Sequence, residues 1–489
     1  MVLRRSMNQK SIKTNTIYNA IKTLSTVLFP LITFPYILRV LHPENIGKIF
    51  FGLSIVSYFS LISSLGIYVY AIRECSVVRD NKEKLSNIAS QIWSINIIMT
   101  VVSYLFLVIT LFVYSKLENY KILIVIQSLS ILFTTLGTDW LNQAMEDFRY
   151  ITIRTVVFQF ISLLLIFVFV HNPEDYIKYA VICLVSSSGA SIVNIWYCRR
   201  RYCRIKFIKN TNWKKHLTPI MYMFVMLLAQ TVFNSVDSTM LGLMHGDREV
   251  GIYSSANKMS TLVTQLVASL LWVILPRMSY YFAIGDYDKI NELLRKVLGF
   301  NALVGLPLVA GTFVMSDEIV YVIAGNEYAD AGCVLKILMI GFLFTLFGGS
   351  FWGNSVLLPS GREKIFMIIC CIAAVVNVIT NYIFIPLYGA IAAAGTTAFS
   401  ALVILVTLLF TVDRNIKITR KSKLIITPVA GCVGICVVCM LCKLIDSLWT
   451  RTIISIVGSS VAYVIISYFG KNELFLELID SLKNKILRR

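Results

Sequence analysis

The sequence predicts an all-α polytopic membrane protein with about 14 transmembrane helices, arranged as two six-helix bundles and two further carboxyl-terminal helices. Three observations predict this fold: the composition, the long apolar runs and an internal repeat. The chain has 489 residues, 57% hydrophobic and 15% charged, and its mean hydropathy is +0.75. Such a composition does not suit soluble domains, and membrane helices of about 20 residues each leave no room for a large aqueous catalytic domain.

The long apolar runs define the predicted helices and their grouping. Six runs precede a basic stretch, six follow it, and two close the chain, at residues 16–41, 49–72, 88–114, 122–144, 153–170, 176–198, 219–244, 251–275, 297–315, 334–357, 365–385, 390–412, 425–444 and 452–469. We therefore expect an amino-terminal bundle over residues 1–200 and a cytoplasmic basic linker over 201–216. A carboxyl-terminal bundle over 217–413 and helices 13 and 14 with the tail over 414–489 complete the chain.

The distribution of Lys and Arg predicts the orientation. The amino terminus, the loops after even-numbered helices and the carboxyl tail hold 34 of the 45 Lys and Arg, and the opposite loops hold 8. Because basic loops stay cytoplasmic, we expect a protein of the bacterial cytoplasmic membrane with both termini on the cytoplasmic side. This arrangement explains the net charge of +19 by contact with anionic membrane lipids, without a nucleic-acid partner.

An internal repeat relates the two bundles. Residues 41–47 and 244–251 each combine His, an acidic residue, an aliphatic residue and Gly at an external turn. Arg73 follows Gly47 by 26 residues, and Arg277 follows Gly251 by the same interval. Six helices, an even number, separate the copies, so the repeat is parallel. This geometry is typical of transporters in which two bundles rock against each other.

The residues that carry a family resemblance lie around the end of the fourth predicted helix. Residues 139–151, with support from 237–242, 249–254 and 388–395, resemble a polysaccharide flippase of the Wzx type, in the multidrug/oligosaccharidyl-lipid/polysaccharide exporter superfamily. The resemblance implies a MATE-like fold with a cationic central cavity and no cofactor. It also implies flipping of undecaprenyl-diphosphate-linked oligosaccharide repeat units from the cytoplasmic to the outer leaflet, for O-antigen, capsule or exopolysaccharide synthesis. A polysaccharide polymerase and a chain-length regulator are the further partners that it suggests.

Three other functions remain open. A multidrug or organic-cation exporter of the same superfamily shares the fold, and a lipid II flippase differs mainly in the substrate headgroup. A membrane-embedded polymerase or glycosyltransferase is the enzyme alternative. We expect no enzyme, because the longest predicted external connection, near residues 316–333, is under twenty residues. Such chemistry usually needs a large external loop or paired catalytic carboxylates.

Charged residues inside predicted spans are the first candidate ligands, because burying a charge in a bilayer is costly. Asp237 and Lys258 are placed about equally deep from one external turn on helices 7 and 8, so they can pair. The pair is either a structural salt bridge or a phosphate ligand with a protonatable switch. Lys22, about 12 Å into helix 1, either faces the cavity or reaches the interface by snorkelling.

A polar segment at the end of helix 4 supplies a second group of candidates. Its residues recur every three or four positions and predict one polar face, used for sugar binding or for interhelical hydrogen bonds. The group comprises Asp139, Asn142, Gln143, Glu146 and Arg149, and Trp140 belongs to the family-like motif.

Arginines at cytoplasmic helix ends and amides in helices 7 and 8 complete the candidates. Arg73, Arg277 and Arg362 either hold a pyrophosphate or only anchor the helices in the membrane. Asn234 and Asn257 suit a hydroxyl-rich substrate, but amides also link membrane helices.

Cysteines at positions 432, 436, 439 and 442 resemble a metal-binding pattern. They lie in one apolar run with no His or carboxylate nearby, so we expect packing and no metal site.

Overall fold

A computed structural model of the protein describes residues 12–209, 213–411, 416, 423–477 and 479–480. These residues form helices joined by short turns, with no strand among them. Eleven helices within these ranges are long and apolar enough to cross a bilayer. The prediction of an all-helical polytopic membrane protein is confirmed, and the count of 14 helices stays a prediction. Both chain ends lie outside the described residues.

The chain divides into two compact units, Met1–Leu243 and Met244–Arg489. The division falls at the end of α9 (Trp213–Met244), so this helix packs with the first unit. A hydrogen bond of 2.9 Å between Ser57 Oγ and Ser235 Oγ ties α9 to α1. The sequence instead assigns α9 to the second bundle, and the predicted bundle boundaries stay a prediction.

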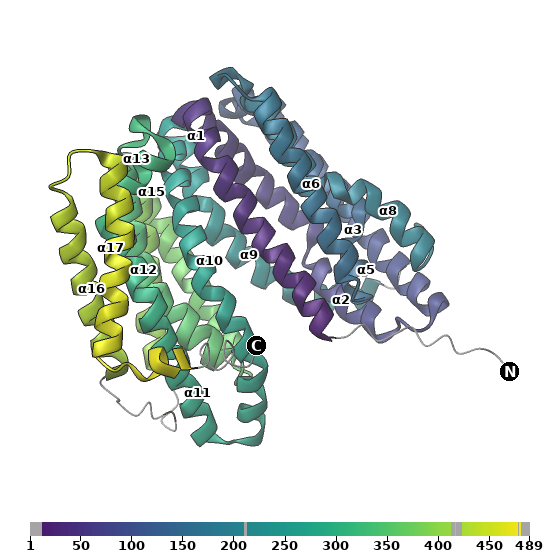
Figure 1. Ribbon diagram of the computed structural model, residues 1–489. Coiled ribbons are helices and arrows are strands. Elements are labelled where there is room, and N and C mark those ends of the chain that lie inside the picture. The colour runs from purple at the N-terminus through teal and green to yellow at the C-terminus, as the bar shows by residue number, and fades with distance from the viewer. Residues whose placement is uncertain (1–11, 210–212, 412–415, 417–422, 478, 481–489) are drawn as a thin grey trace. The chain divides into compact units, whose positions relative to one another are not determined.

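The first unit begins with one long helix, and the helices after it correspond to the rest of the first six predicted spans (Figure 1). The helices are α1 (Ile12–Ser64), α2 (Ile67–Val77), α3 (Lys82–Val113), α4 (Lys121–Gly137), α5 (Asp139–Ala144), α6 (Phe148–Phe169), α7 (Tyr176–Leu184), the π-helical turn η3 (Val185–Gly189) and α8 (Ala190–Arg201). Short 3-10 turns, η1 (Ser115–Tyr120) and η2 (Pro173–Asp175), precede α4 and α7.

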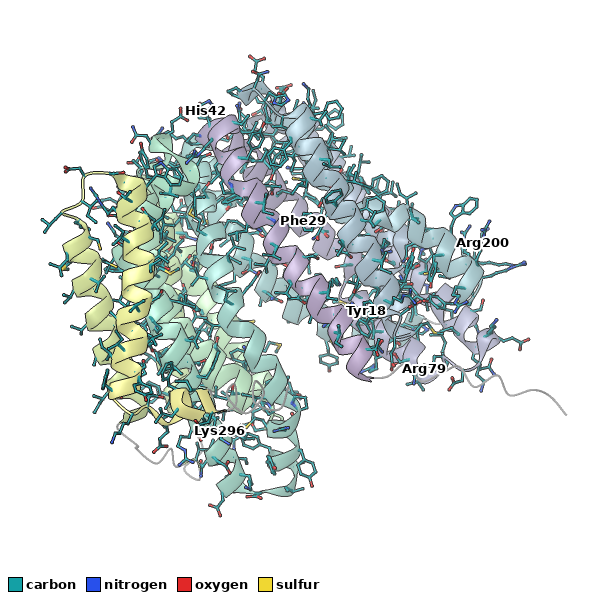
Figure 2. The ribbon with its side chains drawn as sticks, in the orientation of Figure 1. Tyr18, Phe29, His42, Arg79, Arg200 and Lys296 are labelled. Carbon is teal, nitrogen blue, oxygen red and sulfur yellow. The ribbon has the colours of Figure 1, made fainter. Side chains whose placement is uncertain are left out.

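A kink divides α1 into the first two predicted spans. His42 has the non-helical angles φ 59° and ψ 164°. Pro43 disfavours a helical ψ in the residue before it, whereas the positive φ of His42 is not a requirement of proline. In Figure 2, Tyr18 and His42 lie at opposite ends of the first half of α1, with Phe29 between them. Arg79 and Arg200 lie toward the Tyr18 end of the same unit, as expected if those loops share one side of the membrane.

The second unit contains the remaining spans. Its elements are α10 (Asp247–Ile284), α11 (Tyr287–Phe300), η4 (Asn301–Gly305), α12 (Leu306–Val314), α13 (Ser316–Ala324), η5 (Asn326–Tyr328), α14 (Ala331–Thr345), η6 (Leu346–Leu357), α15 (Glu363–Phe410), α16 (Lys423–Cys442) and α17 (Leu448–Phe469). A kink at Gly389, with φ 54°, divides α15 into predicted spans 11 and 12. Glu249 Oε2 accepts a hydrogen bond of 2.7 Å from the Ala390 amide, which stabilises the start of the second half.

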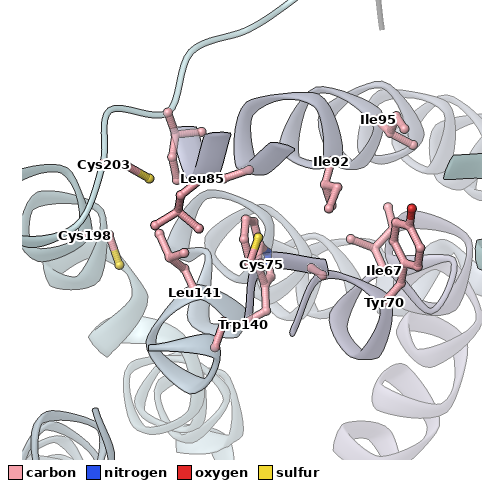
Figure 3. Packing of buried hydrophobic residues seen from close by; sticks show 14 of the residues in the cluster. Ile67, Tyr70, Cys75, Leu85, Ile92, Ile95, Trp140, Leu141, Cys198 and Cys203 are labelled. Carbon is pink, nitrogen blue, oxygen red and sulfur yellow. The ribbon is translucent and has the colours of Figure 1, made fainter. Parts of the chain in front are cut away.

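Aliphatic and aromatic side chains, with several alanines and cysteines, form a buried core cluster in the first unit. Tyr70, Leu85 and Trp140 are buried there together with Cys75 and Cys198 (Figure 3). The two thiols pack as small apolar groups against neighbouring helices. In the second unit, Cys439 of α16 packs in the same way against Met315 and Ile435.

Candidate functional site

A polar cavity of about 370 Å³ lies within the first unit. Six elements contribute to its wall: α1, α2, α5, α6, the π-helical turn η3 and the first residue of α8. Local π-helical geometry is frequent at functional sites, and here it places two adjacent serines on the wall. The lining residues are Lys22, Thr26, Tyr68, Asp139, Gln143, Ile151, Arg154, Thr155, Gln159, Ser186, Ser187 and Ala190.

Three charged residues determine the electrostatics of this cavity. Arg154 Nη1 lies 3.0 Å from Asp139 Oδ1, and the side chains are 7% and 33% exposed. Lys22 interacts electrostatically with both residues. The wall therefore carries two cations and one carboxylate, and its excess positive charge favours an anionic ligand.

Arg154 makes further contacts besides its ion pair with Asp139. Its Nη1 is 3.5 Å from the Ala190 carbonyl oxygen, and its guanidinium lies 5.4 Å from the centre of the Tyr150 ring. Its Nε–H is buried and has no hydrogen-bond partner among the described residues. A buried donor of this kind indicates a position that a bound acceptor can fill.

Amide and hydroxyl groups surround the charges. Gln143 comes from α5 and Gln159 from α6, and the buried Oε1 of Gln159 has no hydrogen-bond partner among the described residues. Ser186 and Ser187 of η3 face the same cavity. Such groups can donate and accept hydrogen bonds, as a hydroxyl-rich ligand requires.

A break between α4 and α5 positions Asp139. Thr138 has left-handed angles, φ 48° and ψ 42°, so the chain turns before Asp139 begins α5. Asn194 Nδ2 then donates to Asp139 Oδ1 at 2.9 Å and to the Gly137 carbonyl oxygen at 2.5 Å. Asn142 Nδ2 donates to Asn194 Oδ1 at 2.7 Å, which fixes the α5 helix against α8.

The predicted polar face at the end of helix 4 is wrong as a continuous surface. Helix α5 ends at Ala144, and the positive φ of Glu146 separates Glu146 and Arg149 from the three members in α5. Asp139 and Gln143 line the cavity, whereas Asn142 is fully buried in hydrogen bonds with α8. Glu146 instead forms an exposed ion pair of 2.7 Å with Arg79, and Arg149 is exposed. A helical projection cannot detect this, because it assumes unbroken helix.

A smaller cavity of about 50 Å³ adjoins the first, and Asp139 and Tyr68 line both. Trp140 lines this smaller space and otherwise packs in the buried core. Ser63 and Thr135 also line this space, and their hydroxyls form buried hydrogen bonds with the Thr100 hydroxyl. The role predicted for Trp140 in substrate binding stays a prediction.

Other predicted ligands lie outside the cavity. Arg73 is exposed, pairs with Glu74 at 3.2 Å and lies 5.5 Å from the Tyr70 ring centre. Asn234 on α9 and Arg277 on α10 are exposed. Their predicted contacts with substrate stay predictions.

Asp237 and Lys258 belong to different units, on α9 and α10. Asp237 is buried in the first unit, while Lys258 and its neighbour Asn257 are half-buried in the second. The predicted pairing of Asp237 with Lys258 stays a prediction.

Sequence reasoning missed Arg154. It is the second residue of the predicted fifth span, so its charge is attributed to the basic cytoplasmic loop that precedes this span. The structure begins α6 at Phe148, so Arg154 lies well inside the helix. An arginine followed by a long uncharged run was the available signal, because a charge inside a membrane helix usually has a function.

The family comparison identifies this architecture. A family model described as "Polysaccharide biosynthesis protein" matches residues 12–282, more than half of the chain. The chain belongs to this family. The match confirms the predicted resemblance to Wzx-type flippases of the exporter superfamily. A second family model, MatE, matches residues 223–383.

Two relatives align with this chain over most of their own length. A protein of Escherichia coli (strain K12), described as an O-antigen transporter, is 23% identical over 406 residues, which cover 80% of this chain and 94% of the relative. The capsular polysaccharide biosynthesis protein CapF of Staphylococcus aureus is 25% identical, over 76% of this chain and 91% of the relative. The family and its relatives confirm the prediction of a transporter and not an enzyme.

Solved structures share the fold. The lipid II flippase MurJ in an inward closed conformation superposes with a TM-score of 0.74 at 17% identity, covering 95% of this chain and 100% of MurJ. An inward-facing multidrug resistance MATE transporter gives a TM-score of 0.60 at 14% identity, over 81% of this chain and 97% of that structure. The fold is therefore that of multi-pass membrane transporters.

Proposed function

We propose that the protein flips undecaprenyl-diphosphate-linked oligosaccharide repeat units from the cytoplasmic to the outer leaflet of the bacterial inner membrane. The cationic cavity of the first unit is the observation that carries this proposal. It combines Lys22 and the buried Arg154 with hydrogen-bonding side chains. The names of the E. coli and S. aureus relatives, which refer to O-antigen and capsular polysaccharide, support the same substrate class.

In this proposal the cavity recognises the two chemical parts of the substrate separately. Lys22 provides a mobile ammonium for the diphosphate, and Arg154 provides a fixed guanidinium whose Nε–H can donate to it. Gln143, Gln159 and the η3 serines bind sugar hydroxyls. Side chains that both donate and accept hydrogen bonds suit repeat units whose sugars differ in shape but all carry hydroxyls.

Asp139 sets the strength of binding. Its carboxylate neutralises part of the positive charge next to Arg154, so a diphosphate competes with it for the guanidinium. Competition lowers affinity and permits release after each cycle, as transport requires. The substrate crosses without covalent chemistry, by alternating access of the two bundles. Both termini of the chain lie on the cytoplasmic side. A polymerase and a chain-length regulator act on the released units.

The experiment uses cells that lack the gene. We expect lipid-linked repeat units to accumulate on the cytoplasmic face of the inner membrane and surface polysaccharide to disappear. The wild-type gene and a Lys22→Arg/Lys258→Arg control should restore both, whereas Lys22→Ala/Lys258→Ala should not. Normal polysaccharide in the deleted strain would contradict the proposal.

Multidrug export is the second candidate, favoured by the MatE match over residues 223–383 and by the buried Asp237 of α9. Organic-cation export favours a buried acid of this kind. The same deletion strain tests it. Raised sensitivity to cationic drugs with normal polysaccharide would select this function, and loss of lipid II transport would select a lipid II flippase.

A further inference from the structure

The segment that follows α8 is docked on α3 by a row of serines. Ser86 Oγ donates to the Arg204 carbonyl oxygen at 2.5 Å, and Ser90 Oγ accepts from the Lys206 amide at 3.0 Å. Ser94 Oγ accepts from the Ile208 amide at 2.8 Å. The spacing explains the fit, because four residues of helix and two residues of extended chain both advance by about 6 to 7 Å.

We name residues 202–208 the basic strap. Alternate side chains of this extended segment point in opposite directions, as in a strand. Cys203 and Ile205 are buried in the core of the first unit, whereas Arg204 and Lys206 are exposed. The serine row therefore holds two cations at a fixed spacing outside the core.

A surface hollow of about 640 Å³ lies beside the basic strap. Five cations line it, and Glu83 is the one acidic residue in its described wall. Arg204 and Lys206 come from the strap, Lys82 from the start of α3, and Arg199 and Arg200 from the last turn of α8. Cations gathered from three segments around one hollow form a binding surface for a multivalent anion.

Exposed aromatic side chains accompany these cations. Trp196 is 67% exposed, and the Arg200 guanidinium lies 5.2 Å from the centre of its ring. Phe207 of the strap is 48% exposed and lines the hollow. Basic and aromatic side chains together are typical of protein surfaces at the level of lipid headgroups, whereas a soluble anion needs no exposed aromatic residues.

We propose that this hollow binds the phosphate headgroup of an anionic membrane lipid, apart from the transported substrate. The strap cations contact the phosphate, and Trp196 and Phe207 lie against the lipid at the interface. Such a lipid fixes the strap, and with it the start of the connection to α9, at the membrane surface. The site lies wholly within the first unit, so it does not depend on how the two units move.

The experiment measures lipid binding by the purified full-length protein in nanodiscs of phosphatidylcholine that contain increasing amounts of phosphatidylglycerol. Native mass spectrometry then counts the phosphatidylglycerol molecules that each protein retains. Arg204→Gln/Lys206→Gln should lower this affinity at least about ten-fold, as the loss of two charge-assisted contacts requires. Lys364→Gln/Lys471→Gln is the matched control, because both lysines are exposed and lie outside the hollow.

A second variant separates the arrangement of the charges from their number. Ser90→Ala/Ser94→Ala keeps every cation but removes two acceptors of the strap, so it should also weaken binding of phosphatidylglycerol. Inorganic diphosphate added to the nanodiscs should compete only weakly if the lipid is the ligand. Unchanged lipid retention in both variants, or full displacement by diphosphate, would overturn the proposal. Substrate flipping is measured separately, so failure of the proposed function does not affect this result.

Discussion

Arg154 of α6 and Asp139 of α5 form an ion pair in which the guanidinium is buried and the carboxylate is one-third exposed. The pair faces a cavity that Lys22 also lines. The cavity wall therefore has one carboxylate and two cations, and this net positive charge favours an anionic ligand. This arrangement connects a family-like segment of the sequence with the site proposed to bind the substrate diphosphate.

Removing the carboxylate should destabilise the first unit. In Asp139→Asn, Arg154 keeps its buried charge without its counter-charge, and Asn194 loses a charged acceptor. Because Asp139 is partly exposed, we expect a loss of roughly 1 to 3 kcal/mol, less than for a fully buried pair. Thermal unfolding in detergent measures the change. Asp80→Asn, an exposed control, should leave the unfolding temperature unchanged, and an equal shift in both variants would contradict the account.

Close helix packing at Gly137 gives a second prediction. A Cβ at this position would lie 2.5 Å from Ser191 Cβ and 3.0 Å from Ser191 Cα, so α4 and α8 would have to separate. Gly137→Ala should therefore cost about 1 to 3 kcal/mol and disturb Asp139 two residues later. Gly395→Ala, where a Cβ meets nothing within 4 Å, is the matched control and should be neutral or slightly stabilising. Thermal unfolding of the two variants makes the comparison, and equal behaviour would refute the packing argument.

The kink in α15 depends on Glu249. Its carboxylate accepts the Ala390 amide next to Gly389, so Glu249→Ala leaves that amide without this acceptor. We expect a loss of about 0.5 to 2 kcal/mol, as for other helix caps, and faster amide hydrogen exchange at Ala390. Glu249→Gln keeps an acceptor oxygen and should recover most of the stability. Unchanged exchange in Glu249→Ala would show that the cap contributes nothing.

Cysteine labelling tests the predicted orientation. Cys333 is exposed at the start of α14, in a loop predicted to be external. Burial raises the pKa of the Cys203 thiol to about 11, so this cysteine has little thiolate near neutral pH. A membrane-impermeant maleimide should label a variant with Cys333 as its single cysteine in intact cells. A variant with only Cys203 should stay unlabelled even after permeabilisation. Labelling of Cys333 only after permeabilisation would reverse the orientation.

The helices were largely predictable, because membrane spans are long apolar runs whatever they pack against. The two halves of α1 correspond to the predicted spans over residues 16–41 and 49–72, and α2 completes the second of these spans. In the same way, the two halves of α15 correspond to predicted spans 11 and 12. The turns were less predictable. Pro43 indicates the kink at His42, but no residue type requires the left-handed angles of Thr138.

The candidate site was predictable only in part. Lys22, Asp139 and Gln143 were recognisable as polar residues in apolar surroundings, and all three line the cavity. Arg154 was missed because α6 begins five residues before the apolar run. Its pairing with Asp139 depends on the packing of α5 and α6 after the turn at Thr138, which hydropathy cannot show.

The most direct test of the central claim is flipping by the purified protein in liposomes that contain an undecaprenyl-diphosphate-linked oligosaccharide. The initial rate of transfer between leaflets is compared for wild type, Lys22→Ala and Lys22→Arg. Lys22 lies on the cavity wall at the amino-terminal half of α1, and we expect both variants to fold. The account predicts that Lys22→Ala flips about 10- to 100-fold more slowly, as the loss of one charged hydrogen bond requires, and that Lys22→Arg keeps most of the rate. Equal rates for wild type and Lys22→Ala would contradict it.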